Sequence, residues 1–273
     1  MPESLESIEK KIKSLEIQGA KNIAVESLKF LRIYSRKKGF GKGFDKAMNK
    51  LEKARPTAVV LHNCLEILRK DKSTKTINSL LRKLKQSEQQ IAVKGSVLIK
   101  NNSKIMTRCH SREALAMIKQ AWKNGKKIKV YATETRPKWQ GVKTAKELAK
   151  MGIPVTLIVD SAMGFFIKDV DIVIVGTDAM RKEGFANKIG TYMLALLCKE
   201  HKKPMYVVGD TLKLDMRKKI KIEERDPDEV YKEKMKNLDV RNPAFDITPW
   251  KYVKRVVTEK GVMTPGNIKK MLK

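Results

Sequence analysis

The chain has 273 residues, of which 41% are apolar, so it can bury the core of one large domain or of two smaller ones. It contains no uncharged apolar run of about 18 residues, which argues against a membrane span. Its first residues mix charged and apolar side chains, unlike a secretory signal peptide. Three cysteines without a CxxC pair indicate a reducing cytoplasm, and three histidines without a ligand-spacing motif indicate no zinc site.

The net charge is +30, from 60 Lys and Arg against 30 Asp and Glu. Such an excess fits a polyanionic partner, either RNA or a multiply phosphorylated small molecule. The excess is spread along the chain, with +13 over residues 1–100 and +17 over residues 101–273. An even spread is also what a solvated, lysine-rich surface gives, so charge alone does not indicate specific nucleic-acid binding.

Residues 1–100 are predicted to form a helical domain. Apolar side chains recur there at three- and four-residue steps, as in Leu5, Ile8, Ile12 and Leu15. The glycines of RKKGFGKGFDK, residues 36–46, interrupt this pattern. No strand precedes them, so we interpret them as a loop between two helices and not as a dinucleotide-binding fingerprint.

Residues 101–273 are predicted to form an α/β domain with a mostly parallel sheet. Short apolar runs at 104–107, 128–133, 155–160, 171–178 and 205–210 alternate with helical or connecting segments. A ligand site is then expected at the carboxyl ends of the strands. The polar, charge-rich stretch 214–240 is interpreted as an ordered excursion from this domain.

Cys109 follows the first of these strands and stands just before a helix expected to open near Ser111. The helix N-terminus, with Arg108 and Arg112, would favour the thiolate. A small, inert, buried cysteine is the alternative, and position alone does not choose between the two. Cys64 and Cys198 lie within helical apolar patterns and are expected in the core.

Asp178 ends the apolar strand 171–178, where the core would meet a cleft. Desolvation there could keep its carboxyl protonated for use as a general acid. The alternative is a turn or helix-cap residue, and Asp160 has the same two interpretations.

Two further segments offer polar groups to an oxygen-rich ligand. ETRPKWQG, residues 134–141, presents Arg136 and Gln140, and Asn187 with Lys188 is expected to begin a helix. We therefore expect Cys109, Gln140, Asp178 and Lys188 at one edge of one sheet.

These segments resemble a known family. MTRCHS, ATETRPKWQG, TAKELAKMGIP, VDSA, VGTD and NKIGTY occur in the order and spacing of the family that joins the regulatory subunits of initiation factor 2B to two sugar-phosphate isomerases. Those isomerases act on methylthioribose 1-phosphate and on ribose 1,5-bisphosphate. The resemblance extends from IQGAKNIA and ARPTAVVLHN to RNPAFDITPWKYV, and ARPTAV, MTRCHS and TETRPKWQG look most like the archaeal ribose 1,5-bisphosphate isomerases.

The resemblance implies a helical N-terminal domain, a Rossmann-like C-terminal domain and assembly into dimers or hexamers. It implies isomerisation of ribose 1,5-bisphosphate to ribulose 1,5-bisphosphate in the salvage of AMP-derived ribose, with no metal or redox cofactor and with AMP as a suggested effector. Cys109 would accept a proton and Asp178 would donate one. The implied substrate-binding positions are Gln18, Gly19, Ala20, Lys21, Arg55, His110, Ser111, Arg136, Gln140, Asn187, Lys188 and Lys213.

Three positions depart from the family pattern. Gln18 stands where the isomerases carry a phosphate-binding arginine, Arg108 where histidine is usual, and Thr177 where alanine is usual. Two alternatives follow. The chain could be a non-catalytic homologue of the regulatory subunits, with initiation factor 2 as its partner, or a methylthioribose-1-phosphate isomerase.

Overall fold

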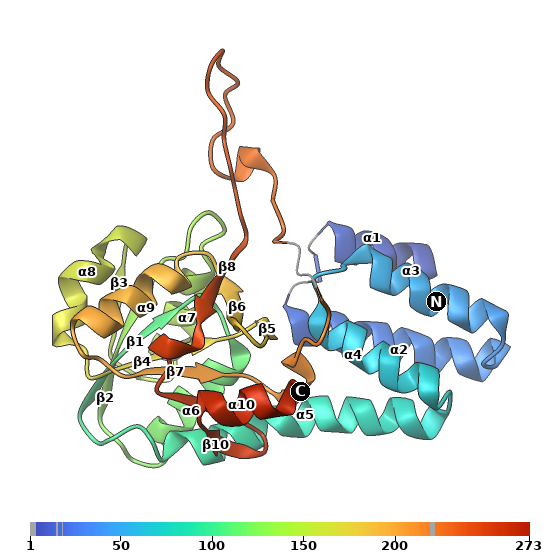
Figure 1. The fold of residues 1–273 in the computed structure, drawn as a ribbon, viewed down its shortest axis with the longest axis horizontal. Helices are drawn as coiled ribbons and strands as arrows, with labels where there is room; N and C mark the ends of the chain where they lie inside the picture. The colour runs from blue at the N-terminus through green and yellow to red at the C-terminus, as the bar shows by residue number, and fades with distance from the viewer. Residues whose placement is uncertain (1–3, 15, 18, 219–221) are drawn as a thin grey trace. The chain divides into compact units, whose positions relative to one another are not determined.

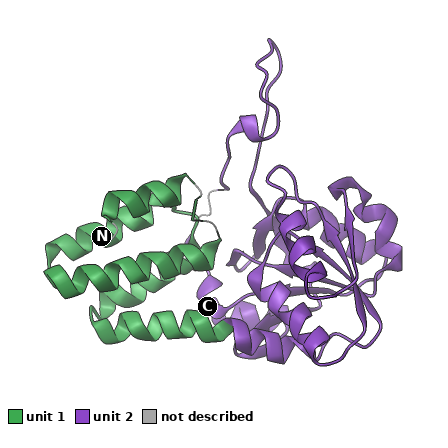
Figure 2. Cartoon of the chain, turned by 180° about the vertical axis from the view of Figure 1, so that it is seen from behind, with its two compact units in different colours: residues 1–87 green, residues 88–273 purple. Residues whose placement is uncertain are grey.

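A computed structural model describes all residues except 1–3, 15, 18 and 219–221. The chain divides into two compact units, residues 1–87 and residues 88–273 (Figure 2). None of the helices in this described part is long and apolar enough to cross a membrane.

The first unit is helical. It consists of α1 (Leu5–Lys13), α2 (Ala20–Lys38), α3 (Lys42–Ala54), α4 (Val59–Lys70) and the beginning of α5 (Thr74–Ser96), which continues into the second unit. The apolar stripes of these helices form its core, with Leu28, Phe44 and Leu65 completely buried. The glycine-rich stretch connects α2 to α3, as predicted.

The second unit is built on a seven-stranded sheet of order β10-β9-β7-β4-β1-β2-β3 (Figure 1). Its strands are β1 (Ser103–Arg108), β2 (Ile128–Thr133), β3 (Val155–Ile158), β4 (Ile172–Gly176), β7 (Met205–Val208), β9 (Arg255–Thr258) and β10 (Gly261–Met263). All neighbours pair in parallel except β9 and β10. The predicted α/β architecture with a mostly parallel sheet is confirmed.

Helices cover both faces of this sheet because side chains alternate along each strand. Met106 packs with α8 (Met163–Phe166), α9 (Thr191–Glu200) and α10 (Pro265–Met271). Its neighbour Ile105 packs on the opposite face with α6 (Arg112–Lys123), α7 (Gln140–Ala149) and the end of α5. Strands buried on both faces explain the continuous apolar runs in the sequence.

A second, antiparallel sheet was not predicted. It contains β5 (Ala179–Met180), β6 (Gly184–Lys188) and β8 (Phe245–Pro249), in the order β5-β6-β8. Asn187 and Lys188 end strand β6, so the prediction that they begin a helix is wrong. Helix α9 begins three residues after Lys188, at Thr191, because Gly190 makes a left-handed turn between them.

The polar segment after β7 has little regular structure. Its described residues include the short 3-10 helices Thr211–Lys213 and Pro227–Glu229, and a bridge pairs Glu224 with Pro243. Glu229 is bonded to Arg225 and to Lys138, at 2.6 and 2.9 Å, so the excursion is tied to the loop after β2.

Candidate active site

The candidate site lies where the order of the strands reverses direction. From β1 the chain continues to β2 and β3 on one side, and then returns to β4 on the other. Arg108 pairs with Val175 in the register of β1 and β4, so Cys109 and Asp178 follow adjacent strands at the same edge. Open α/β sheets bind their ligands at such a switch point.

The backbone of Cys109 is held in an unusual conformation. Its φ is +66°, in the left-handed region that non-glycine residues rarely adopt. The amide of Cys109 donates to Thr135 Oγ1 at 2.9 Å, and its carbonyl accepts from the Thr144 hydroxyl at 2.7 Å. One of these threonines belongs to the loop after β2 and the other to α7. Their hydrogen bonds stabilise the turn that directs the thiol toward the site.

The residues after Cys109 begin α6. Ser111 caps this helix by accepting a hydrogen bond from the amide of Ala114 at 3.3 Å. His110 Nδ1 lies 3.0 Å from the Thr144 hydroxyl, and burial lowers the pKa of this histidine. Both residues were predicted to contact substrate, and that contact stays a prediction.

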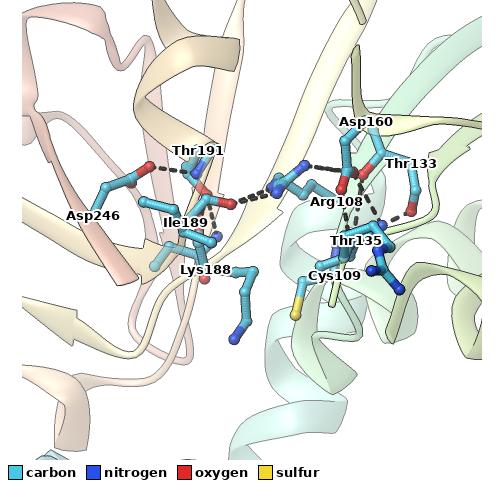
Figure 3. Close-up of polar contacts among 12 residues, drawn as sticks. Arg108, Cys109, Thr133, Thr135, Asp160, Lys188, Ile189, Thr191 and Asp246 are labelled. Carbon is cyan, nitrogen blue, oxygen red and sulfur yellow. Dashed lines mark hydrogen bonds and ion pairs between the residues drawn. The ribbon is translucent and has the colours of Figure 1, made fainter. Parts of the chain in front are cut away.

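Burial raises the pKa of the Cys109 thiol, which corrects the expectation that its surroundings favour the thiolate. Lys188 is the strongest opposing influence, Asp178 adds to the rise, and Arg108 lowers the pKa less than Lys188 does. Figure 3 shows why: the thiol and the Lys188 ammonium extend into the same space, whereas the Arg108 guanidinium turns away toward Ile189 and Asp160.

Asp178 is half-buried just beyond β4, and its amide donates to the carbonyl of Ala186 at 2.9 Å. The hydroxyl of Thr177 bonds the carbonyls of Ala179 and Ala186, which anchors the turn that carries Asp178. The Asp178 charge affects the pKa of both Cys109 and Lys213. Asp178 therefore lies among the charged groups of the site.

Lys213 is buried beside the same turn. Its ammonium lies 2.9 Å from Glu113 Oε1, and Glu113 belongs to the first turn of α6. Burial alone would lower the pKa of Lys213, but Glu113, Asp210 and Asp178 raise it above its ordinary value. The site thus keeps a charged ammonium near Asp178.

The other residues of this unit that were predicted to bind substrate differ in their burial and in their partners. Arg136 is exposed and stacks on the Trp139 ring at 4.9 Å, whereas Gln140 begins α7 with its Oε1 buried and without a hydrogen-bond partner among the described residues. The side-chain amide of Asn187 donates to the Thr191 hydroxyl at 3.0 Å, and the Lys188 ammonium lies 5.1 Å from the centre of the Phe245 ring.

Asp160, which has the same place after β3 as Asp178 has after β4, is a structural acceptor. Its carboxylate accepts from the amides of Thr135 and Arg136 and from the guanidinium of Arg108, at 2.7–3.0 Å. The choice left open for Asp160 is thereby resolved in favour of the turn residue.

Four predicted substrate-binding residues belong to the first unit. Gly19 precedes α2 with a φ of +83°, Ala20 and Lys21 begin that helix, and Arg55 follows α3. Lys21 is buried and Arg55 is half-buried. Gln18 lies outside the described residues. A role for any of them beside Cys109 stays a prediction.

Within the described chain, three side chains close enough to share a metal ion occur once, at Glu52, His62 and Glu66, whose ligand atoms lie within 4.8 Å of one another. Arg69 is already paired with Glu52 at 2.6 Å and with Glu66. Both carboxylates are thus already bonded to one guanidinium, and this arrangement does not favour the binding of a metal cation.

Several residues that build the site were not singled out from the sequence. Thr135 and Thr144 orient Cys109, Glu113 pairs with Lys213, and Asp246 accepts from the amides of Gly190 and Tyr192 at 2.6 and 3.1 Å. Thr135 lies inside the predicted polar block 134–141, which was a usable signal. Asp246 gave none, because strand β8 was not predicted.

Residues 16–265 match the model of the initiation factor 2 subunit family. The chain is 40% identical to ribose 1,5-bisphosphate isomerase of Methanocaldococcus jannaschii, covering 93% of this chain and 90% of that protein. It is 37% identical to methylthioribose-1-phosphate isomerase of Acetivibrio thermocellus, covering 95% and 89%.

The crystal structure of translation initiation factor eIF-2B from Pyrococcus horikoshii superimposes with a TM-score of 0.87 at 30% identity, covering 98% of this chain and 99% of that one. The family match spans most of the sequence, and the structural match spans nearly all of it. The chain is therefore a member of the initiation factor 2 subunit family.

Proposed function

We propose that this protein is an aldose–ketose isomerase that converts ribose 1,5-bisphosphate into ribulose 1,5-bisphosphate. Its similarity to an archaeal enzyme of that name, over more than nine-tenths of the chain, supports the substrate. The observation that carries the chemistry is the pairing of Cys109 with Asp178 across the switch point of the sheet, with Lys188 and Lys213 beside them.

The reaction moves a proton from C2 of the open-chain sugar and delivers one to C1. Asp178, as carboxylic acid, protonates the ring oxygen so that its bond to C1 breaks, and Cys109, as thiolate, takes the C2 proton. A thiol with a raised pKa is a stronger base once ionised, and Lys188 stabilises that ionised form. C1 then takes that proton from Cys109 while the C2 hydroxyl gives its proton to Asp178, so that the ketose forms and both groups are reset.

Two phosphates require cationic partners. Among the described residues of the second unit, the buried ammonium groups that can meet them are those of Lys188 and Lys213, and the guanidinium of Arg136 is exposed. From the first unit, we propose Arg55, Lys21 and the amides at Gly19 and Ala20 as further contacts.

The function is tested by the turnover of enzymatically prepared α-ribose 1,5-bisphosphate. The wild type should form the ketose, and Cys109→Ser and Asp178→Asn should each lose about 10²- to 10⁴-fold in kcat. Cys198→Ala, which alters a core cysteine, should keep its activity. A folded wild type without turnover would contradict the proposal. Adding AMP to the same assay tests it as the effector.

Methylthioribose 1-phosphate is the competing substrate, because a relative of comparable similarity is named for it. Turnover of both sugars by one preparation separates the two activities. A higher kcat/KM for methylthioribose 1-phosphate would replace the proposed substrate while keeping the chemistry.

A regulatory role in translation is the second candidate, favoured by the similarity to the structure named translation initiation factor eIF-2B. A protein that binds the sugar phosphate without turnover, and that recovers initiation factor 2 subunits from native lysate, would establish it instead.

We also infer that copies of the chain associate through the second unit. Phe165 on α8 and Tyr192, Met193 and Leu196 on α9 are exposed, and α8 contacts α9. A contiguous apolar surface of this kind marks a protein–protein contact. Sedimentation should give a dimer or hexamer that Met193→Lys weakens, and a monomeric wild type would exclude the association.

A further inference from the structure

Arg108 connects three parts of the second unit through one guanidinium. It is 3% exposed at the end of β1. Nη1 donates to Asp160 Oδ1 at 2.7 Å and to Thr133 Oγ1 at 3.3 Å, while Nε donates to the carbonyl of Ile189 at 2.9 Å and Nη2 donates to the same oxygen. The ends of β2 and β3 are thereby tied to the loop between β6 and α9 (Figure 3).

The two ends of this connection each adjoin a charged or reactive side chain. Arg108 immediately precedes Cys109, and Ile189 immediately follows Lys188. A displacement of the loop relative to β1 would therefore change the separation of the thiol and the ammonium.

The loop is shaped to receive this guanidinium. Gly190 has a φ of +89°, and a Cβ at that position would lie 2.7 Å from Arg108 Nη2 and 2.8 Å from Cζ. On its other side, the loop is bonded to Asp246 through the amides of Gly190 and Tyr192. The carbonyl of Ile189 and these amides are thus fixed from opposite directions.

The backbone of Cys109 is held independently of the β6–α9 loop, because Thr135 and Thr144 bond its amide and its carbonyl. Lys188 ends β6, where it is paired with Phe245 of β8, so its position depends on that pairing and on what holds the β6–α9 loop that follows it. The Lys188 charge is also the largest influence that favours the Cys109 thiolate, so the ionisation of the thiol reports how close the ammonium lies.

We propose that Arg108 is a positioning residue that fixes the distance between the Cys109 thiol and the Lys188 ammonium by clamping the β6–α9 loop to the end of β1. The catalytic part of this inference rests on the proposed isomerase function, whereas the clamp itself does not.

The test measures the rate of Cys109 alkylation by iodoacetamide against pH, without substrate. Arg108→Lys retains the positive charge but cannot bond Asp160 and Ile189 together. Its alkylation profile should move to higher pH. If the thiol pKa rises by about 0.5, the rate at pH 7.5 should fall about threefold. Peptide mapping confirms that Cys109, and not buried Cys64 or Cys198, is modified.

The matched control is Arg181→Lys. Arg181 is similarly buried and is paired with Asp215 at 2.7 Å and with Glu183 at 2.6 Å, so it bonds neither Asp160 nor Ile189. Its variant should lose stability without a change in the alkylation profile. If Arg108→Lys does not fold, Gly190→Ala displaces the guanidinium from the loop and should move the profile in the same direction.

Kinetics provide the second measurement. With ribose 1,5-bisphosphate, Arg108→Lys should lose about 10- to 100-fold in kcat with a smaller change in KM, because misplaced groups cost rate more than binding. An alkylation profile that superimposes on that of the wild type would overturn the clamp. An inactive wild type with a displaced variant profile would reject the isomerase and retain the clamp.

Discussion

Lys213 and Glu113 form an ion pair in which both side chains are 5% exposed and the ammonium lies 2.9 Å from Oε1. Glu113 also stands in the first turn of α6, two residues after the cap that follows Cys109. The Glu113 carboxylate thus joins the turn after β7, which carries Lys213, to helix α6, which begins just after Cys109.

Glu113→Gln should lower the free energy of unfolding by about 3–5 kcal/mol, because it removes the carboxylate that is bonded to a buried ammonium. The pKa of Lys213 is raised, so the stabilisation is present at neutral pH and is lost only as the pH rises through that raised value. Urea denaturation at pH 7 and pH 9 should therefore give the same difference between wild type and variant.

The control for this pair is Glu147→Gln, which removes the partner of Lys119 in a more exposed pair. Its cost should be about 1 kcal/mol or less. If both variants lost the same free energy of unfolding, the buried pair would be no more stabilising than the exposed one.

Lys188→Met should raise the pKa of the Cys109 thiol further, because it removes the main charge that opposes the effect of burial. At a pH below the pKa, the thiolate fraction falls about tenfold when the pKa rises by about 1, so alkylation at pH 8 should slow in the same proportion. Lys168→Met, which removes another lysine placed over an aromatic ring, should leave the rate unchanged. A faster reaction of Lys188→Met would contradict the assignment.

The sequence predicts the framework of this site better than its details. Five apolar runs correspond to β1, β2, β3, β4 and β7, because strands buried on both faces are continuously apolar. Their carboxyl ends place Cys109 and Asp178 correctly at one edge. The core positions of Cys64 and Cys198 are confirmed as well.

The failures share a physical cause. Strand β6 is stabilised by pairing with β5 and with β8, which lies some 60 residues away, so the local pattern at Asn187 and Lys188 carries no sign of it. Arg108 lowers the pKa of the Cys109 thiol, as expected, but less than Lys188 does and too little to offset burial, because its side chain points elsewhere. Bonds to Asp160 and Ile189, both distant in sequence, turn that side chain away.

Gly141→Ala should disrupt the loop that follows β2. A Cβ there would lie 1.5 Å from the carbonyl oxygen of Thr133, so the backbone of the loop must move. The cost should reach the upper part of the range of about 1–3 kcal/mol typical of overpacking, measured by urea denaturation. Gly41→Ala, which meets open space, should stay within about 1 kcal/mol of the wild type. Tolerance of alanine at both positions would contradict the close approach.

The carboxyl of Glu229 has a strongly lowered pKa. A hydrogen bond from Arg225, with contributions from Lys138 and Asn242, lowers its pKa to about 2. Because the folded pKa lies below the unfolded value of about 4.3, its stabilisation is complete above that value and is lost as the pH falls toward 2. The protection of residues 222–243 against hydrogen exchange, relative to the intrinsic exchange rate at each pH, should therefore fall across this interval.

At pH 8, Glu229→Gln should expose the same segment to trypsin, with faster cleavage after Lys232, Lys234 and Lys236. The matched control is Glu233→Gln in the same segment, because the Glu233 carboxylate accepts a hydrogen bond from the Tyr231 hydroxyl, a neighbour within the excursion itself. Equal cleavage of the two variants would mean that the excursion is not held by Glu229. Faster cleavage of Glu229→Gln alone would identify this carboxylate, bonded to Lys138 two residues before Gln140, as the link between the excursion and the site.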